Sequence, residues 1–433
     1  MGPEVQFLIA LALFLVLLGV GMAVPFAIMV PAVIYLLMQG GVASLNGLGL
    51  VSWGSMNSFT LTAIPLFMLM AEILGVSGLS GRIYGGLSKL VAVLPGGLLQ
   101  TNIAGCAIFA SVSGSSVATA ASIGSVALPQ LTGRAYNPAL AAGSLAAGGT
   151  LGILIPPSFA MIIYGTFTET SVPKLFMAGV VPGLITTFLF MFYIGLHATV
   201  SPRTAPREAG PKSVAELARA LADVMPFAVI IVGTLGGLYL GIVTTTEAAV
   251  IGCFLAIVLG ALFGDLTLRG FVQALFSTVR FTGNILFLIL AAFVFSFAIS
   301  FGGIGGKITE FIVGLDLSRT EFFVALFILY TVLGCFIESL GMIVITLPLI
   351  FPLLATYDID PILFGVVLVM FAEVAQITPP MGINLFVIQS IWDGKLNQVI
   401  IGAIPFEIIL FVVLILIVTW PDLALWLPTR MSN

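Results

Sequence analysis

The sequence predicts an all-α protein that crosses a membrane many times and contains two inverted copies of one folding unit. Three observations lead to this prediction. First, 60% of the 433 residues are hydrophobic and only 7% are charged, too few polar residues to cover a water-soluble body. Second, apolar segments of helix-spanning length recur from end to end, without the polar/apolar alternation of barrel strands. Third, a set of motifs occurs twice in the same order.

The first 58 residues are expected to form amino-terminal scaffold spans. Apolar runs cover about 5–23 and 25–43, and a Gly/Ser/Asn-rich connector follows through Asn57. No Lys or Arg precedes the first run, so we expect it to remain as a span and not to be cleaved as a signal peptide.

Residues 59–199 are expected to form the first repeat. A span over about 59–76 is followed by a segment carrying Arg82 and Lys89, amphipathic enough to lie along the interface. The apolar runs 97–111 and 117–131 flank the polar knot Ser113-Gly114-Ser115-Ser116 and are short for full spans, so we predict a re-entrant hairpin over 97–131. A span over 137–167 is broken at Pro156-Pro157. Such open backbone survives at membrane depth only when it is buried in protein or lines a polar cavity.

A hydrophilic stretch over 200–222 separates the first repeat from the rest of the chain. It carries Arg203, Arg207, Lys212 and Arg219, and the positive-inside rule places it in the cytoplasm. Counting crossings back from this loop places the amino terminus in the periplasm. Beyond the loop we expect central scaffold spans over 223–280 and a second repeat over 281–427, with a hairpin at 320–355 and a broken span at 361–392.

The two predicted repeats share their motifs in order. Residues 78–83 and 303–308 match in their glycines, aliphatic residues and cation. The tip Ser113 to Ser116 corresponds to Glu338-Ser339-Leu340-Gly341, and later matches pair Leu128-Pro129 with Leu347-Pro348, Asn137-Pro138 with Asp360-Pro361, and Pro156-Pro157 with Pro379-Pro380. Chance is a poor account of five ordered matches. The crossing count makes the first hairpin enter from the cytoplasm and the second from the opposite face, so the repeats are inverted.

Inverted repeats with Gly/Pro-interrupted segments indicate a secondary transporter whose site lies near the bilayer midplane. A desolvated Na⁺ needs several oxygens, and carbonyls freed where a helix unwinds provide them together with hydroxyls. Half-helix amino termini at the tips would present N–H groups to an anionic substrate. One predicted cation cage consists of Ser113, Ser115, Gly152, Ile155 and Pro157, and a second consists of Ser339, Gly341, Ala375, Thr378 and Pro380.

Less specific explanations compete at several positions. Gly/Ser-rich stretches in membrane helices usually serve close packing, which is our interpretation of the glycines at 233–241; the duplication favours function at the tips and double prolines. Among acidic residues, Glu338 is the strongest candidate because it stands at the second tip. Arg280 fits a substrate contact and a snorkelling side chain equally well. Glu247 lies at a span boundary, where capping a helix amino terminus is the alternative to a functional buried charge. Three further carboxylates fit ion or proton relays and helix-end residues nearly equally well: Glu72, Glu373 and Glu407.

Other functional classes fit the sequence poorly. With one histidine, His197, and three cysteines in apolar segments, no Ser-His-Asp or Cys-His set can be assembled. The glycine-rich run near 302–309 fails the ATP-binding pattern, because Phe301 replaces its first Gly and Ile308 its Ser/Thr. We therefore expect no ATP hydrolysis. A net charge of -4 and unclustered basic residues argue against a nucleic-acid partner.

Several motifs resemble the large membrane subunit of tripartite ATP-independent periplasmic (TRAP) transporters. They are 109–120 (FASVSGSSVATA) with Gly124-Ser125, 149–158 (GTLGILIPPS), 378–387 (TPPMGINLFV) and 246–249 (TEAA). Together with the length and the inverted halves, this similarity covers nearly the whole chain.

The resemblance implies Na⁺-driven uptake of an organic acid, such as a four-carbon dicarboxylate or a sugar acid, across a bacterial or archaeal inner membrane. It implies a periplasmic substrate-binding protein that delivers the substrate, a small four-helix membrane subunit, and an elevator motion of the hairpins and broken spans. Glu338 departs from the pattern, where Asp is common at this tip position. The residues that we place at the substrate are Ser116, Thr119, Glu338, Arg280 and Asn384.

Two rival interpretations remain open at this point. A stand-alone organic-anion or ion porter of similar inverted-hairpin build would need no binding protein. A membrane-embedded enzyme would need polar catalytic pairs inside the bilayer, and a purely structural subunit would lose transport only through lost assembly.

Overall fold

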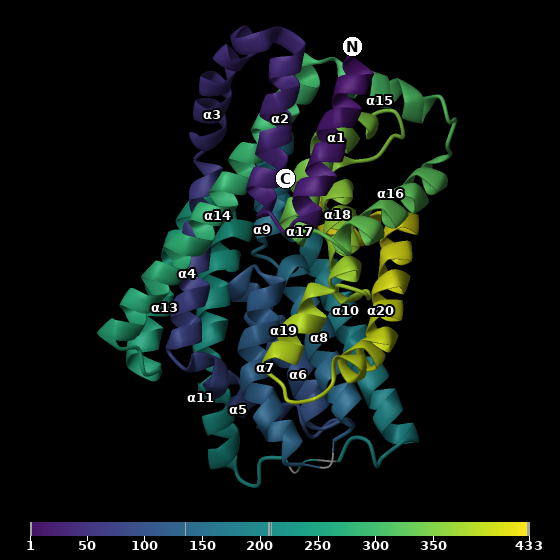
Figure 1. Cartoon of the computed structure of the whole chain (residues 1–433). Coiled ribbons are helices and arrows are strands. Elements are labelled where there is room, and N and C mark those ends of the chain that lie inside the picture. The colour runs from purple at the N-terminus through teal and green to yellow at the C-terminus, as the bar shows by residue number, and fades with distance from the viewer. Residues whose placement is uncertain (1, 135, 207, 209, 431–433) are drawn as a thin grey trace.

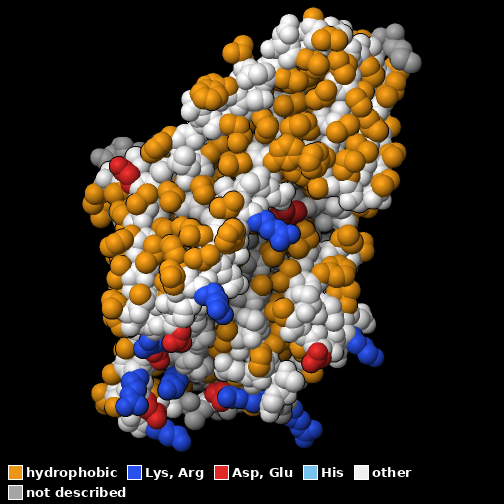
Figure 2. Space-filling view, turned by 60° about the vertical axis from the view of Figure 1, so that its left-hand side comes forward, with side chains coloured by type: hydrophobic (Ala, Val, Ile, Leu, Met, Phe, Trp, Pro, Cys, Tyr) orange, Lys and Arg blue, Asp and Glu red, His pale blue; other side chains and the backbone are white. Residues whose placement is uncertain are grey.

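The computed structural model describes residues 2–134, 136–206, 208 and 210–430, and within these ranges every regular element is a helix (Figure 1). Seven described stretches are long and apolar enough to cross a membrane, and a bent helix pair makes an eighth if it is taken as one span. On the face shown in Figure 2, hydrophobic side chains are spread over the whole surface, while charged side chains gather mainly toward one end. The prediction of an all-α, multi-pass membrane protein is confirmed.

The amino-terminal segment is more helical than its composition predicts. Helices α1 (Pro3–Gly19) and α2 (Val24–Gly40) lie near the expected positions, but the connector expected through Asn57 is a 3-10 turn, Gly41–Gly47, followed by α3 (Leu48–Met56). Leu50 and Trp53 of α3 are exposed. Because an apolar environment offers the backbone no partners, a helix is the conformation that satisfies the N–H and C=O groups of this segment.

The first repeat contains the predicted interruptions. Helices α4 (Ala63–Val76) and α5 (Leu79–Leu90) meet at an angle of 70° at Gly78, whose φ of 73° is left-handed. The hairpin segment 97–131 corresponds to α6 (Leu98–Ser113) and α7 (Ser116–Thr132). The remaining helices are α8 (Pro138–Leu154), α9 (Phe159–Thr168) and α10 (Val172–Val200).

The hydrophilic stretch 200–222 is only partly a loop, which corrects the boundary expected from sequence. Helix α11 (Val214–Ile231) begins inside it, because Ser213 caps the helix by accepting a hydrogen bond from Glu216 N at 3.2 Å. Arg207 lies outside the described residues. A π-turn and the short α12 (Gly237–Tyr239) lead to α13 (Thr245–Phe263), where Glu247 forms a capping box with Thr244, and then to α14 (Leu268–Phe301).

The second repeat follows the same plan, with an offset of 223 residues from the hairpin tips to the double prolines. Its helices are α15 (Ile304–Val313), α16 (Arg319–Gly334), α17 (Ser339–Ile350), α18 (Pro361–Ile377), α19 (Ile383–Ser390), α20 (Leu396–Thr419) and α21 (Asp422–Arg430). Residues capping the second hairpin arms, Ser115 and Glu338, are 223 positions apart (338 minus 115), as are Pro138 and Pro361 at the starts of α8 and α18. Both double prolines contain a cis peptide bond. In Figure 1, α6 and α7 lie in the lower half with the α10–α11 linker, whereas α15 and α16 lie in the upper half.

The two broken spans form the centre of the molecule. Every residue of α8 from Leu140 to Leu154 and of α18 from Leu363 to Ile377 is buried. Helix α8 packs against α6, α7, α18 and α20, and α18 packs against α16, α20 and α8. The two helix breaks therefore lie within protein, as open backbone at membrane depth requires.

Candidate functional site

The tips of the two hairpins meet at one small cavity. Its volume is about 10 Å³, room for roughly one water molecule. Tip one contributes Gly114 to Val117, and tip two contributes Glu338, Ser339 and Leu340. The other lining residues are Ile153, Phe159, Phe281 and Gln376. Residues more than 220 positions apart in sequence thus line one site that neither repeat forms alone.

The first tip is ordered by its own hydroxyl groups. Gly114 ends α6 with a left-handed φ of 65°, and Ser115 caps α7 by accepting a hydrogen bond from Ala118 N at 3.3 Å. The hydroxyls of Ser113 and Thr119 are 2.6 Å apart, and Thr119 Oγ1 donates to the Ser115 carbonyl at 2.8 Å. Both hydroxyls and this carbonyl are held close together.

The first tip docks on the first helix break. Phe159 N donates to the Gly114 carbonyl at 3.3 Å, and the Pro157 carbonyl lies beside Gly114. A Cβ at Gly152 would be only 2.5 Å from the Ser115 carbonyl oxygen, so the approach of tip and α8 requires glycine there. Of the first predicted cage, Ser113, Ser115, Gly152 and Pro157 are thus neighbours; Ile155 ends α8 with its side chain against Gly183.

The second predicted cage is spread more widely. Ser339 is buried in the tip cavity, and Ala375 packs against Gly334 at the end of α16. The hydroxyl of Thr378 donates to Val374 O and to the Glu407 carboxylate, both at 2.7 Å. At the remaining two positions, a Cβ on Gly341 would meet Ile337 and Val24, and Pro380 is exposed.

Four of the five predicted substrate residues lie at or next to the first tip and cavity. Asn384 Nδ2, on α19, donates to Ser116 Oγ at 2.6 Å and to Ala146 O at 3.2 Å, which ties the second broken span to the first hairpin. Thr119 holds the tip as described, and Glu338 lines the cavity while remaining exposed. Arg280 is exposed on α14 and forms no ion pair with another described residue; its neighbour Phe281 lines the cavity.

Sequence reasoning missed two polar residues of α18. Gln376 lines the cavity, and Glu373, mentioned only as an ambiguous carboxylate, is fully buried one turn earlier. Both Glu373 carboxylate oxygens and Gln376 Oε1 are buried, and no described residue is within hydrogen-bonding reach of them. The signal that could have found them is that no other polar side chain occurs between Pro361 and Ile377.

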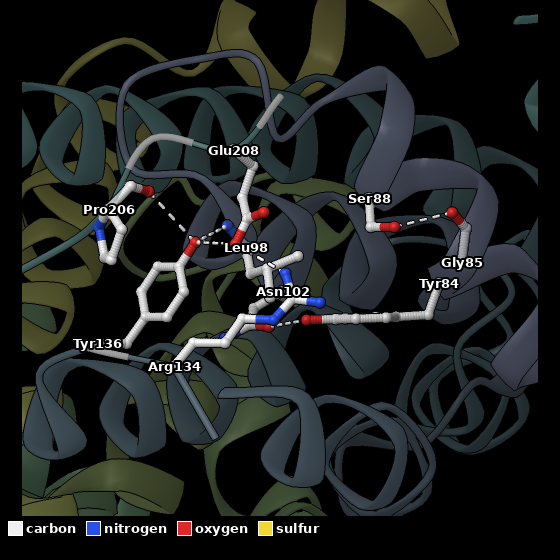
Figure 3. Close-up of polar contacts among 9 residues, drawn as sticks. All are labelled: Tyr84, Gly85, Ser88, Leu98, Asn102, Arg134, Tyr136, Pro206 and Glu208. Atoms are coloured by element: carbon white, nitrogen blue, oxygen red, sulfur yellow. Dashed lines mark hydrogen bonds and ion pairs between the residues drawn. The ribbon is translucent and has the colours of Figure 1, made fainter. Parts of the chain in front are cut away.

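A separate polar cluster closes the base of the first hairpin (Figure 3). The hydroxyl of Tyr136 accepts a hydrogen bond from Leu98 N at 3.0 Å and lies within hydrogen-bonding distance of Pro206 O and Glu208 Oε1. Glu208 also pairs with Arg134 at 2.7 Å. Burial, together with the nearby Glu208 carboxylate, raises the pKa of Tyr136 to about 12. The α10–α11 linker is therefore fastened to the hairpin base.

A larger polar cavity, of about 700 Å³, opens beside the turn between α9 and α10. It borders the starts of three helical segments, at Thr60, Val172 and Thr245. Hydroxyl groups dominate its polar lining, and Glu169 is the only charged residue among the described residues that line it. This cavity is large enough for an organic acid, whereas the tip cavity is not.

Comparisons with known proteins agree on one relationship. Residues 9–423 match the family model described as "Tripartite ATP-independent periplasmic transporter, DctM component". The C4-dicarboxylate TRAP transporter large permease protein DctM of Pseudomonas aeruginosa is 35% identical over 387 residues, covering 89% of this chain and 90% of that protein. The sialic acid TRAP transporter large permease protein SiaM of Vibrio cholerae is 29% identical over 416 residues, covering 95% and 96%.

A solved structure supports the fold. The crystal structure of the Alcanivorax borkumensis YdaH transporter, described as having an unusual topology, superposes with a TM-score of 0.59 at 16% sequence identity. The match covers 88% of this chain and 89% of that one.

Proposed function

This chain belongs to the DctM-component family of tripartite ATP-independent periplasmic transporters, and from that premise we propose that it carries an organic acid anion across a bacterial or archaeal inner membrane by Na⁺-coupled symport. The observation that carries the proposal is the convergence of two hairpin tips on one cavity between two broken helices. This arrangement places unwound backbone and hydroxyl oxygens beside helix amino termini, which suits a cation and an anion bound together.

The first tip has the chemistry that Na⁺ binding needs. Ser115 and Pro157 would contribute carbonyl oxygens, and Ser113 a hydroxyl, none of which carries a full charge. Among the described residues, no group of three or more His, Cys, Asp or Glu side chains is placed to hold a metal, so the donor set matches a monovalent cation of the alkali type better than zinc. Na⁺ that binds here and crosses the membrane with the substrate would couple uptake to the Na⁺ gradient.

The substrate is an organic acid in this proposal. The two relatives above are named for C4-dicarboxylates and for sialic acid, which are both carboxylates. Ser116, Asn384 and Glu338 would contact it at the cavity, and Arg280 would approach from the neighbouring turn of α14. Because the tip cavity has room for roughly one water, the substrate must enter through a rearrangement of the hairpins.

The remaining parts of the proposal concern assembly and motion. A periplasmic substrate-binding protein delivers the acid, and a small four-helix membrane subunit braces the scaffold spans. The amino terminus faces the periplasm and the α10–α11 linker faces the cytoplasm. The polar cavity at the α9–α10 turn is then the outer mouth. The hairpins and broken spans move together as an elevator against α2, α4, α11, α13 and α14.

Reconstitution tests the proposal directly. Proteoliposomes containing the chain and its small subunit should accumulate a labelled organic acid only with an inward Na⁺ gradient and the cognate binding protein, and a panel of organic acids identifies the substrate. Ser115→Ala and Ser339→Ala should lower uptake while complex formation stays normal. Uptake without the binding protein would point to a stand-alone porter, uptake that ignores Na⁺ would refute the coupling, and loss of assembly in both variants would indicate a structural role.

A further inference from the structure

The second broken span contains a set of buried oxygens that have no hydrogen-bond partner among the described residues. Four of them belong to buried side chains: both carboxylate oxygens of Glu373, Oε1 of Gln376 and Oδ1 of Asn384; a fifth, Oε1 of Gln389, belongs to a half-buried side chain near the end of α19. Glu373 and Asn384 have no exposed surface, and Gln376 is 4% exposed. All four atoms are hydrogen-bond acceptors, and leaving buried acceptors unpaired is costly.

The first broken span has no such set. All residues of α8 and α9 are described, and none has a buried side-chain polar atom without a partner. At the 223-residue offset, Glu373, Gln376 and Asn384 correspond to Thr150, Ile153 and Met161. Thr150 satisfies its hydroxyl on Ala147 O at 2.8 Å. Unsatisfied buried oxygens therefore distinguish the described residues of the second broken span from those of the first; elsewhere in the first repeat, Ser80, Gln100 and Thr101 each have one.

The Glu373 and Gln376 side chains share one face of α18. Three residues apart on a helix, they are separated by about 60° around its axis. Phe371 and Ala375 lie on the opposite side, where Phe371 contacts Phe327 and Tyr330 of α16 and Ala375 contacts the end of that helix. Glu373 therefore points away from α16, on the side from which Gln376 reaches the tip cavity.

No described cation neutralises Glu373. Helices α8, α9, α17 and α19, which pack against α18, contain no Asp, Glu, Lys, Arg or His. On the other packed helices, charged residues occupy terminal turns, except Glu407, which accepts from Thr378 and has the same sign. These terminal residues are Arg319, Glu321, Lys174, His197, Asp422 and Arg430. None of the three ion pairs among the described residues involves Glu373.

We propose that the second broken span holds the charged cation site of this protein, with the Glu373 carboxylate as counter-charge and the Gln376 and Asn384 oxygens facing a monovalent cation such as Na⁺. Buried charges in proteins are paired or coordinate cations. A proton would satisfy a single oxygen, whereas acceptors on three side chains call for a multiply coordinated ion. This inference rests on the proposed Na⁺ coupling and adds that the two repeats bind the ion unequally.

Na⁺-dependent stability of the purified full-length chain tests the inference without transport. Thermal unfolding is followed while NaCl replaces choline chloride at constant ionic strength. If a full negative charge lies within about 10 Å of the bound cation, in surroundings with an effective dielectric constant of about 20, its removal lowers the affinity for the cation roughly tenfold. Glu373→Gln should therefore need about tenfold more Na⁺ for half of the stabilisation, and it should be more stable than wild type without Na⁺. Glu373→Asp, which keeps the charge, should restore most of the Na⁺ response.

Two further variants keep the test decisive. Glu321→Gln removes an exposed carboxylate of the same repeat and should leave the Na⁺ midpoint unchanged. Gln376→Leu removes one unsatisfied acceptor at similar volume and should also weaken the Na⁺ response. It replaces Glu373→Gln as the test if that variant does not fold.

An unchanged midpoint in both Glu373→Gln and Gln376→Leu would overturn the inference. So would an infrared carbonyl band of a protonated acid, present in Na⁺-saturated wild type and absent from Glu373→Gln, because the counter-ion would then be a proton. In both cases Na⁺ coupling could still hold. A wild-type chain with no Na⁺ response, in stability or uptake, would overturn the inference and the proposed coupling together.

Discussion

Substituting Gly152 by alanine should disable the first tip with only one added methyl group. The new Cβ would lie 2.5 Å from both the Ser115 carbonyl oxygen and the Thr119 hydroxyl. To regain an ordinary contact of about 3.4 Å, the tip must retreat by about 0.9 Å. Neither neighbour can yield easily, because the carbonyl is backbone and the hydroxyl is held by two hydrogen bonds.

The size of the effect follows from this displacement. Overpacking a buried contact costs about 1–3 kcal/mol of stability. Ion ligands tolerate shifts of about 0.2 Å, so a displacement several times larger should remove the carbonyl of Ser115 from any cation site. We expect Gly152→Ala to lower Na⁺-driven uptake at least tenfold, a conservative figure beside the roughly hundredfold loss that a 1 Å misplacement can cause.

The assay compares uptake and thermal unfolding of Gly152→Ala with those of a matched glycine variant. Gly105 is buried in α6 of the same hairpin, and a Cβ there would make only ordinary contacts of 3.6–3.9 Å. Gly105→Ala should be neutral or stabilising by roughly 0.5–1 kcal/mol, since alanine favours the helix. If Gly152→Ala transports like wild type, the close approach of tip and α8 is not what organises the site; an equal loss of uptake in Gly105→Ala would show that any added methyl group in the hairpin has this effect.

Three further variants probe other contacts of the site and the linker. Asn384→Leu should decouple the second broken span from the first hairpin and reduce uptake severely, and wild-type uptake would show that this hydrogen bond is dispensable. Tyr136→Phe leaves Leu98 N–H without its partner and should increase amide exchange at the hairpin base. Because the pKa of Tyr136 is raised to about 12, its hydroxyl keeps its proton to higher pH in the folded state than in the unfolded state. The free energy of unfolding should therefore fall as pH rises from about 10 to about 12. Thermal unfolding of Tyr136→Phe should lack this part of the pH dependence. The exposed Arg134–Glu208 pair should show a coupling energy below about 1 kcal/mol in a double-mutant cycle of stability, and a much larger value would mean that the linker is held more tightly than surface ion pairs allow.

Errors in the sequence-based boundaries have a common cause. The Gly/Ser/Asn-rich connector before Asn57 and the charged stretch before residue 222 both resemble loops by composition, yet α3 and α11 occupy parts of them. Composition describes what a segment contains, whereas its conformation here depends on the apolar surroundings and on a cap at Ser213.

The linear order of residues was sufficient to identify a multi-pass helical protein, the two interrupted segments and the paired motifs, because hydrocarbon forbids open backbone and prolines mark where helices must break. It also identified the tip serines and Asn384. Only the folded arrangement revealed that both tips share a cavity, that Asn384 bonds to Ser116, and that Glu373 has no hydrogen-bond partner in the described part of the chain. Those facts depend on contacts between segments more than 200 residues apart, and such distances are a consequence of packing that local sequence does not encode.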